Sequence, residues 1–163
     1  MPLADQTIGN YVFLWGQKQE KTPTWYGLFT ETGEETEVID VLHYIWTGNW
    51  PENRSPRIDS MRLNGKPDHR SVRLKASKTY PAQLKIQDPD GDSLTYLWQV
   101  KQESNADQVG GDFEESISNL DNLITGPMAS KTQLLAPEKP GAYRLFVYAY
   151  DGQGHAAHAN IPF

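Results

Sequence analysis

The stretch 88–98, DPDGDSLTYLW, constrains the fold of this chain more than any other part of its sequence. Aspartate, proline and glycine are typical of tight turns, because they tolerate or pre-set the backbone dihedrals that a turn requires. After the turn, Leu94, Tyr96, Trp98 and Val100 recur at every second position. A period of two is typical of a strand that presents one face to the interior. The sequence therefore predicts a turn followed by a strand whose inner face carries Trp98.

Short strand patterns separated by turn signals continue through the rest of the chain. Strands are expected at 58–63, 72–75, 82–87, 94–101, 132–135, 142–150 and 156–161, with a long polar loop at 104–130. The run Pro140-Gly141-Ala142-Tyr143 is similar to a tyrosine corner, and Leu145 follows it where an antibody domain carries cysteine. Seven short strands and an interior tryptophan predict a mainly β protein, an immunoglobulin-like Greek-key β-sandwich.

The N-terminal third has a different composition and a different periodicity. Residues 1–50 contain nine of the eighteen aromatic residues, and the apolar run 11–15 predicts a short buried strand. A helix is expected at about 34–47, begun by a capping box of Thr32 and Glu35 and ended by Gly48 and Pro51. Its apolar stripe consists of Val38, Val41, Leu42, Ile45 and Trp46. One strand and one helix cannot enclose a core, so this segment is expected to need neighbours.

Two stretches resemble known families. Residues 88–98 resemble the PKD and cadherin-like repeats of secreted bacterial proteins, in which DPDGD-x-LTY-x-W recurs. Residues 11–57 resemble the last βα unit of a (β/α)8-barrel glycoside hydrolase, of the family-2-like kind found in Bacteroidetes, in which a PKD-like module ending in a phrase like ANIPF follows the barrel. The resemblance implies that residues 1–56 are the end of such a barrel with a linker, and that 57–163 are a PKD/Ig-like module.

The resemblance also implies a function and a location. The chain is expected to be a non-catalytic accessory module of a secreted, periplasmic or cell-surface carbohydrate-processing enzyme, which braces the barrel or contacts polysaccharide. The parent protein is then a glycoside hydrolase that uses two carboxylates, and those carboxylates lie on barrel strands that precede this sequence. No catalytic residue is therefore assigned within the chain. A Ca²⁺-stabilised adhesion or spacer domain remains the alternative.

Charge and composition limit the partners. The net charge of −6 disfavours nucleic acid and anionic membrane surfaces, and no apolar run is long enough to span a bilayer. The chain contains no cysteine, which excludes disulfides and thiolate chemistry. The sequence shows no signal-peptide pattern after Met1. The expected partners are therefore polysaccharide or the parent barrel, and no cofactor is assigned apart from the Ca²⁺ considered next.

Four aspartates form the one candidate metal site. Asp88, Asp90 and Asp92 alternate along the turn, and Asp151 in a later turn is the most plausible fourth oxygen donor for Ca²⁺. The spacing is not that of an EF-hand, because Gln99 stands where a bidentate glutamate is required. The competing interpretation is a turn in which the aspartate side chains accept hydrogen bonds from nearby backbone N–H groups. We expect the turn rather than the metal site.

Candidate sugar contacts follow from the barrel resemblance. In those families an aromatic residue at the end of the last strand forms a platform beneath the sugar ring, a place that Trp15 would take here. Gln17, Lys18 and Trp25 of the following loop would contribute further contacts. The alternative is that both tryptophans only pack the rim of the barrel.

The last candidate is a row of aromatic residues on the predicted strand 142–150. Tyr143, Leu145, Val147 and Ala149 are expected to face the core, which places Phe146, Tyr148 and Tyr150 on the outer face. Since a soluble protein seldom exposes such a row, we expect the N-terminal segment to cover it, most plausibly with the helical residues 38–45. A carbohydrate platform is the alternative. His155 and His158 are expected to be surface residues rather than metal ligands.

Overall fold

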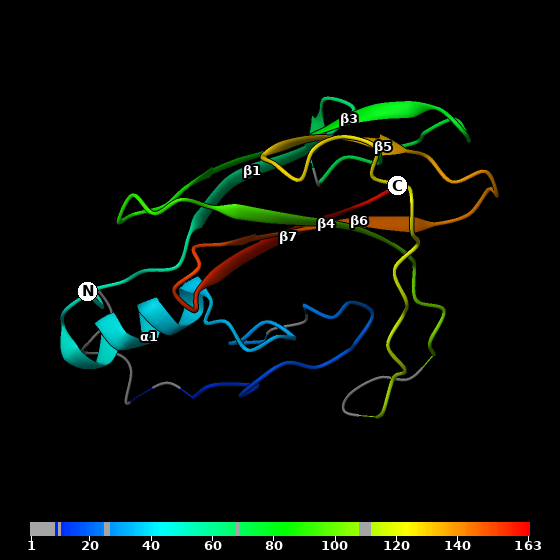
Figure 1. Cartoon of the computed structure of the whole chain (residues 1–163). Helices are drawn as coiled ribbons and strands as arrows, with labels where there is room; N and C mark the ends of the chain where they lie inside the picture. Colours follow the sequence, from blue (N-terminus) through cyan, green and yellow to red (C-terminus); the bar gives the residue numbers. More distant parts are fainter. Residues whose placement is uncertain (1–8, 10, 25–26, 68, 108–111) are drawn as a thin grey trace.

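The computed structural model describes residues 9, 11–24, 27–67, 69–107 and 112–163. The fold is mainly β, with one short helix before two antiparallel sheets, as the sequence predicted (Figure 1). The elements are α1 (Glu37–Thr47), β1 (Arg57–Leu63), β2 (Lys66–Pro67), β3 (Thr79–Gln87), β4 (Thr95–Gln102), β5 (Lys131–Leu135), β6 (Tyr143–Tyr150) and β7 (Ala156–Pro162). In the described part of the chain no helix is long and apolar enough to cross a membrane.

The two sheets pack face to face and enclose the core. One sheet has the strand order β2-β1-β3-β5, and the other has the order β4-β6-β7. The core between them is formed by Met61, Leu63, Val72, Ala82, Leu84, Trp98, Val100, Leu134, Tyr143, Leu145, Val147, Ala149 and Ile161. Trp98 is buried as expected, and its indole N–H donates a 2.8 Å hydrogen bond to the Ala129 carbonyl.

The tyrosine corner is present at the start of β6. The hydroxyl of Tyr143 donates a 2.7 Å hydrogen bond to the carbonyl oxygen of Lys139, four residues earlier. This bond fixes the chain where it enters β6. From there the period of two holds along the strand, because Leu145, Val147 and Ala149 are fully buried in the core, as the alternation predicted.

Helix α1 begins and ends close to the predicted positions, but its first turn is built differently. The N-cap residue is Thr36, not Thr32, and the Thr36 hydroxyl donates to the Leu28 carbonyl instead of capping the helix. The predicted capping box of Thr32 and Glu35 is therefore wrong, because the helix begins only at Glu37 and the Thr32 hydroxyl donates to the Glu34 carboxylate instead. Gly48 ends the helix in the left-handed conformation, as glycine allows without steric cost.

Two predicted strands are absent, and one short strand was not predicted. The expected strand at 11–15 is absent: the side chains of Tyr11, Phe13 and Trp15 are 72–100% exposed, and Gly16 turns the chain at φ +93°. Residues 72–75 are also not a strand, although Val72 joins the core. The two-residue strand β2 was missed because it is too short to show periodicity.

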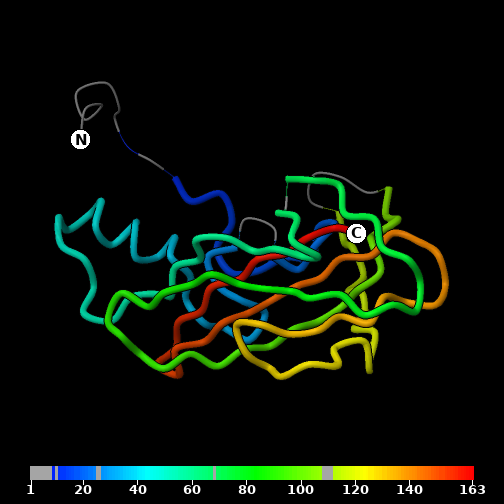
Figure 2. Tube along the Cα trace, turned by 90° about the horizontal axis from the view of Figure 1, so that it is seen from above, coloured from blue at the N-terminus to red at the C-terminus, as the bar shows by residue number. Residues whose placement is uncertain are grey.

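Residues 16–24 and 27–36 form a further layer, called here the N-terminal layer. This layer runs beneath the β4-β6-β7 sheet, on the side away from the core (Figure 1). Helix α1 lies at the end of the molecule where β6 turns into β7, as the view from above also shows (Figure 2). The N-terminal layer and α1 are thus packed against the sandwich, which supplies the neighbours that the sequence indicated they need.

Candidate functional site

The aromatic residues on the outer face of β6 lie under the N-terminal layer. Phe146 is 2% exposed and Tyr148 is 7% exposed, whereas Tyr150 is half-buried. Phe146 shares a cavity of only about 10 Å³ with Gln19, Lys21 and Pro23, so the layer leaves almost no space against this ring. The cover is therefore the loop before the helix and not the helical residues 38–45 that we expected. The helix lies at the end of the sheet instead.

The tyrosine hydroxyls report the same burial. Burial raises the pKa of Tyr148 well above its ordinary value, and nearby Tyr150 and Glu31 raise it further. Burial likewise raises the pKa of Tyr150, where the Glu34 carboxylate adds to the effect and a hydrogen bond with Thr32 opposes it. Glu31, Thr32 and Glu34 belong to the N-terminal layer, so charged and polar groups of that layer face the row from outside.

A carboxylate ties the N-terminal layer to the long loop after β4. Glu114 accepts hydrogen bonds from the Gln19 side-chain amide at 3.1 Å, the Lys21 backbone N–H at 2.9 Å and the Ser104 hydroxyl at 2.6 Å. The Ser104 hydroxyl and the Lys21 N–H lower the pKa of Glu114 below its ordinary value, because they stabilise the charged form. No periodic pattern in the sequence indicates this contact, which joins residues more than 90 positions apart.

A second polar junction joins the segment around α1 to the turn between β6 and β7. Asp151 accepts hydrogen bonds from the backbone N–H groups of Gln153 and His155 and, at 2.8 Å, from the Asn53 side chain. His155 lies 3.3 Å from Asp151 through Nδ1 and 3.6 Å from Glu35 through Nε2. His155 is thus largely buried between two carboxylates, contrary to the surface position that we expected.

The pKa of Asp151 reflects this junction. Burial by itself would raise that pKa, but the hydrogen bonds from Gln153, Asn53 and His155 stabilise the carboxylate and bring the pKa below its ordinary value. Asp151 therefore stays ionised at neutral pH and holds the turn as an acceptor of hydrogen bonds.

The other three aspartates also accept hydrogen bonds. Asp88 Oδ1 accepts from the backbone N–H groups of Asp90 and Asp92, both at 3.0 Å. Asp90 accepts from the Arg54 backbone at 2.7 Å, and Asp92 accepts from the Gln153 side chain at 2.6 Å. Within the described ranges, no group of three or more His, Cys, Asp or Glu residues is arranged to hold a metal ion. The geometry is that of an Asx turn joined to its neighbours.

The candidate sugar contacts are only partly described. Trp15 is 72% exposed, and its ring meets Phe29 edge-on at 5.5 Å between centroids. The Gln17 amide donates to the Pro23 carbonyl at 2.8 Å, and Lys18 forms an ion pair with Glu20 at 2.8 Å. Trp25 lies outside the described residues. Of the described candidates, Trp15 presents most of its surface to solvent.

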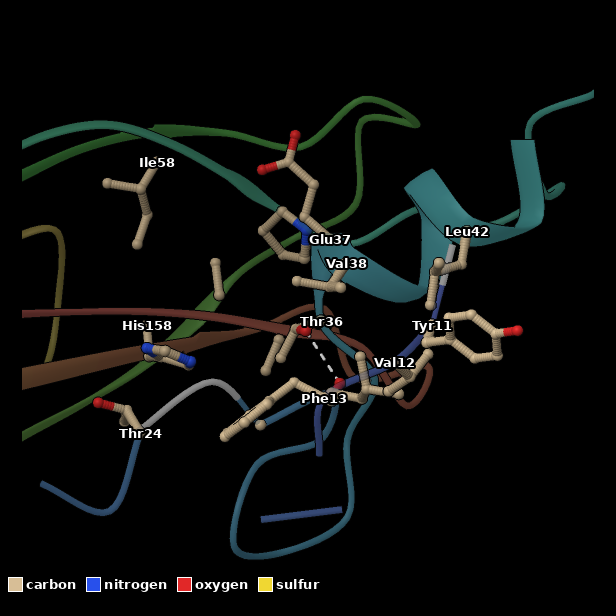
Figure 3. Close-up of a pocket in the computed structure, with 15 residues that line it drawn as sticks. Tyr11, Val12, Phe13, Thr24, Thr36, Glu37, Val38, Leu42, Ile58 and His158 are labelled. Atoms are coloured by element: carbon tan, nitrogen blue, oxygen red, sulfur yellow. Dashed lines mark hydrogen bonds between the residues drawn. The ribbon is translucent and has the colours of Figure 1, made fainter. Parts of the chain in front are cut away.

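A cavity of about 670 Å³ opens where the N-terminal layer, α1, the start of β1 and β7 meet (Figure 3). Apolar side chains form much of its wall, including Phe13, Leu28, Leu42 and Ile58. His158 of β7 also lines the cavity, and burial lowers its pKa, so this imidazole is neutral at pH 7. The side chain of His158 is half-buried rather than freely exposed as expected, because Thr24 of the N-terminal layer lies on the same cavity wall.

Helix α1 exposes most of the apolar stripe that the sequence predicted. Leu42 is buried, but Val38, Val41, Ile45 and Trp46 are 39–62% exposed. The buried partner of Leu42 on this helix is polar: Asp40 is fully buried and accepts a 2.8 Å hydrogen bond from the Ser55 backbone N–H. The outward side of α1 is therefore an apolar surface rather than a solvated helix face.

No family model matches the chain, and no curated protein matches it. Among solved structures, the chain is similar to a nucleoside hydrolase-related hypothetical protein from Saccharophagus degradans that is associated with carbohydrate metabolism. The TM-score is 0.42 and the sequence identity is 19%, over 68% of this chain and 25% of that one. The chain thus spans about a quarter of that protein's length. A likeness of this size assigns neither a family nor an activity.

Proposed function

We propose that this chain is a non-catalytic accessory module of a secreted carbohydrate-processing enzyme, and that α1 braces the catalytic domain. The observation that carries the proposal is the exposed apolar stripe of α1, formed by Val38, Val41, Ile45 and Trp46. An apolar surface of this kind is typical of a protein–protein contact, because its exposure to water is unfavourable. The carbohydrate part of the proposal rests on the resemblance of residues 11–57 to the end of a glycoside hydrolase barrel.

The N-terminal layer supports a bracing role. It is hydrogen-bonded to the loop after β4 through Glu114, and to the start of β7 and the turn before it through Glu35. A helix that leaves such a layer is held in a constant orientation, so a domain that packs on α1 would be oriented by the sandwich. A bracing module has to hold its partner domain in a fixed orientation in this way.

The first test is a comparison with the longer natural polypeptide that includes the residues encoded before Met1. We expect Val41→Ser/Ile45→Ser to leave the melting temperature of the present chain nearly unchanged, and to lower that of the longer protein by several degrees. Phe113→Ser, which alters a residue that is 86% exposed on the distant loop, serves as the matched control. A coding sequence without a catalytic domain before Met1, or equal melting temperatures in the longer protein, would contradict the proposal.

Direct contact with polysaccharide is the second candidate function, favoured by the exposure of Trp15. A flat indole ring in contact with water suits the C–H face of a pyranose, and Trp15 is 72% exposed. Binding to a glycan array by the wild-type chain, lost in Trp15→Ala, would support this function. Turnover of aryl-glycosides by the pure chain, abolished by replacing one Asp or Glu, would contradict the non-catalytic assignment.

A further inference from the structure

The pairing register of β7 determines which of its backbone groups point away from β6. Tyr143 and Phe163 exchange two hydrogen bonds, and Asp151 N–H donates to the His155 carbonyl. In an antiparallel pair, hydrogen-bonded positions alternate with positions whose N–H and C=O groups point outward. Residues 157, 159 and 161 are therefore bonded to β6, whereas Ala156, His158, Asn160 and Pro162 direct their backbone groups to the outer edge of the sheet.

Within the described residues, the chain itself forms backbone hydrogen bonds only to the beginning of this edge. Glu35 pairs with it in the parallel direction, since Glu35 N–H donates to the Gly154 carbonyl and Ala156 N–H donates to the Glu35 carbonyl. After Thr36 the chain turns into α1 and leaves the edge. At the far end, Pro162 has no N–H to offer. Among the described residues, none bonds to the backbone N–H or C=O groups of His158 and Asn160.

Open space lies along this same stretch. The cavity of about 670 Å³ contains Ala156, Ala157 and His158 in its wall. A shallower one of about 580 Å³ is lined by His158, Ala159, Asn160 and Pro162. Thr24 and His158 belong to both walls, so the two cavities adjoin each other along β7, and together they are called the β7 groove here. Figure 3 shows the residues that line the larger cavity, among them His158 and Ile58.

At the opposite edge of the same sheet, the backbone groups at the centre of β4 are hydrogen-bonded to the loop that follows this strand. There, Leu120 N–H donates to the Val100 carbonyl at 2.7 Å, and Val100 N–H donates to the Asn119 side chain at 3.0 Å. In the other sheet, β5 is bonded to residues 123 and 125 of the same loop. Uncovered sheet edges attract further strands, and proteins usually cover or block them.

We propose that the outer edge of β7 is a binding site for an extended peptide segment, which adds as a fourth strand to the β4-β6-β7 sheet. The outward N–H groups of His158 and Asn160 and the outward carbonyls of Ala156, His158 and Asn160 complement an extended main chain. The pairing begun by Glu35 continues in register along the same edge. Alternate side chains of the peptide enter the groove, where Leu28 and Ile58 favour an apolar residue. This inference is independent of the proposed bracing role of α1.

A single strand fits this edge better than a second copy of the protein. Paired strands must approach to about 4.8 Å. The edge of β7 lies in a groove between the start of β1 and the N-terminal layer. In a dimer, the β7 edge of the second copy would be recessed in the same way. The start of β1 and the N-terminal layer would therefore have to move before the two edges could pair. One extended peptide, with no sheet behind it, enters the groove without that rearrangement.

The test is a nuclear magnetic resonance titration of the ¹⁵N-labelled full chain with an acetylated nine-residue peptide in which threonine and valine alternate. We expect the shift changes to centre on residues 156–160, and the His158 and Asn160 amides to exchange at least tenfold more slowly with solvent. The same peptide with proline at alternate positions is the negative probe, because it lacks half of the N–H donors.

Two pairs of variants separate the backbone from the side chain. His158→Pro removes one outward N–H without removing a bond to β6, whereas His158→Ala keeps that N–H; Asn160→Pro and Asn160→Ala form the second pair. We expect each proline variant that retains the native circular dichroism spectrum to bind at least tenfold more weakly than its alanine partner. Equal affinities within a pair, shift changes centred elsewhere, or no shift change at millimolar peptide would overturn the proposal. Concentration-dependent shifts of residues 156–160 without peptide would assign the edge to a second copy and overturn it as well.

Discussion

The backbone N–H of Ala156 donates a 2.8 Å hydrogen bond to the carbonyl oxygen of Glu35. Glu35 lies before the helix and Ala156 at the start of the last strand, so the bond joins two segments that are far apart in the sequence. Together with the bond from Glu35 N–H to the Gly154 carbonyl, it attaches the N-terminal layer to the β4-β6-β7 sheet. The layer and the sheet are therefore expected to unfold together.

Replacing Phe146 and Tyr148 with serine should test this coupling directly. Both rings are buried beneath the N-terminal layer, so the double variant should lose several kcal/mol of unfolding free energy, since about 3–5 kcal/mol is typical for one buried aromatic ring. Urea denaturation measures the loss, and Phe113→Ser should change it by less than about 0.5 kcal/mol. Unchanged stability with lost polysaccharide binding would instead favour a sugar platform.

The two sides of α1 should differ in their effect on stability. Leu42→Ala should lower the unfolding free energy by about 2 kcal/mol or more, because the side chain is buried against the cavity wall. Ile45→Ala, one turn further on the exposed side, should change it by at most about 0.5 kcal/mol. Thermal and urea unfolding of both variants measure the difference. Equal losses would mean that the apolar stripe is already covered in the isolated chain.

The half-buried His158 should make the chain less stable in mild acid. Its folded-state pKa lies below the ordinary 6.5, so the unfolded chain binds a proton at a higher pH than the folded chain does. The contribution of the neutral His158 to the unfolding free energy is therefore fully present above about pH 6.5. It is lost as the pH falls from there towards the folded-state pKa. The melting temperature should fall over this range in the wild type and fall less in His158→Gln. Parallel curves for the two proteins would contradict this assignment.

The carboxylates of Asp151 and Glu114 should act in a lower pH range. Hydrogen bonds depress both pKa values in the folded state, so their contributions are present above the ordinary values of 3.8 and 4.5 and are lost only as the pH falls below them. The His158 effect is thus separable from theirs along one titration.

Calcium should have little effect on stability. Each of the four aspartates Asp88, Asp90, Asp92 and Asp151 already accepts a hydrogen bond from this chain through at least one carboxylate oxygen, so a bound ion would have to compete with those bonds. We expect millimolar Ca²⁺, compared with excess chelator, to raise the melting temperature by less than about 5 °C, which corresponds to roughly 1–2 kcal/mol for a chain of this size. A larger rise in the melting temperature would favour the metal-site interpretation of these aspartates.

The sequence alone predicted the sandwich, because its signals are local. Alternating residues identified β4 and β6 and placed Leu145, Val147 and Ala149 in the core, and Pro140-Gly141 predicted the corner made by Tyr143. The helix was predicted for the same reason, since Gly48 and the apolar spacing act within a few residues. Such patterns depend on backbone geometry and on the spacing of apolar residues, and both are set by residues that are close together in the sequence.

Only the tertiary structure determined which segments cover which apolar side chains. The same aromatic density that suggested a buried strand at 11–15 belongs to an exposed segment, while the polar loop before α1 covers Phe146 and Tyr148. The Thr36 hydroxyl bonds to Leu28, and Glu114 accepts from Lys21, across distances in the sequence that no local pattern records. Whether an apolar side chain is buried depends on which distant segment packs against it, and that choice is made when the whole chain folds.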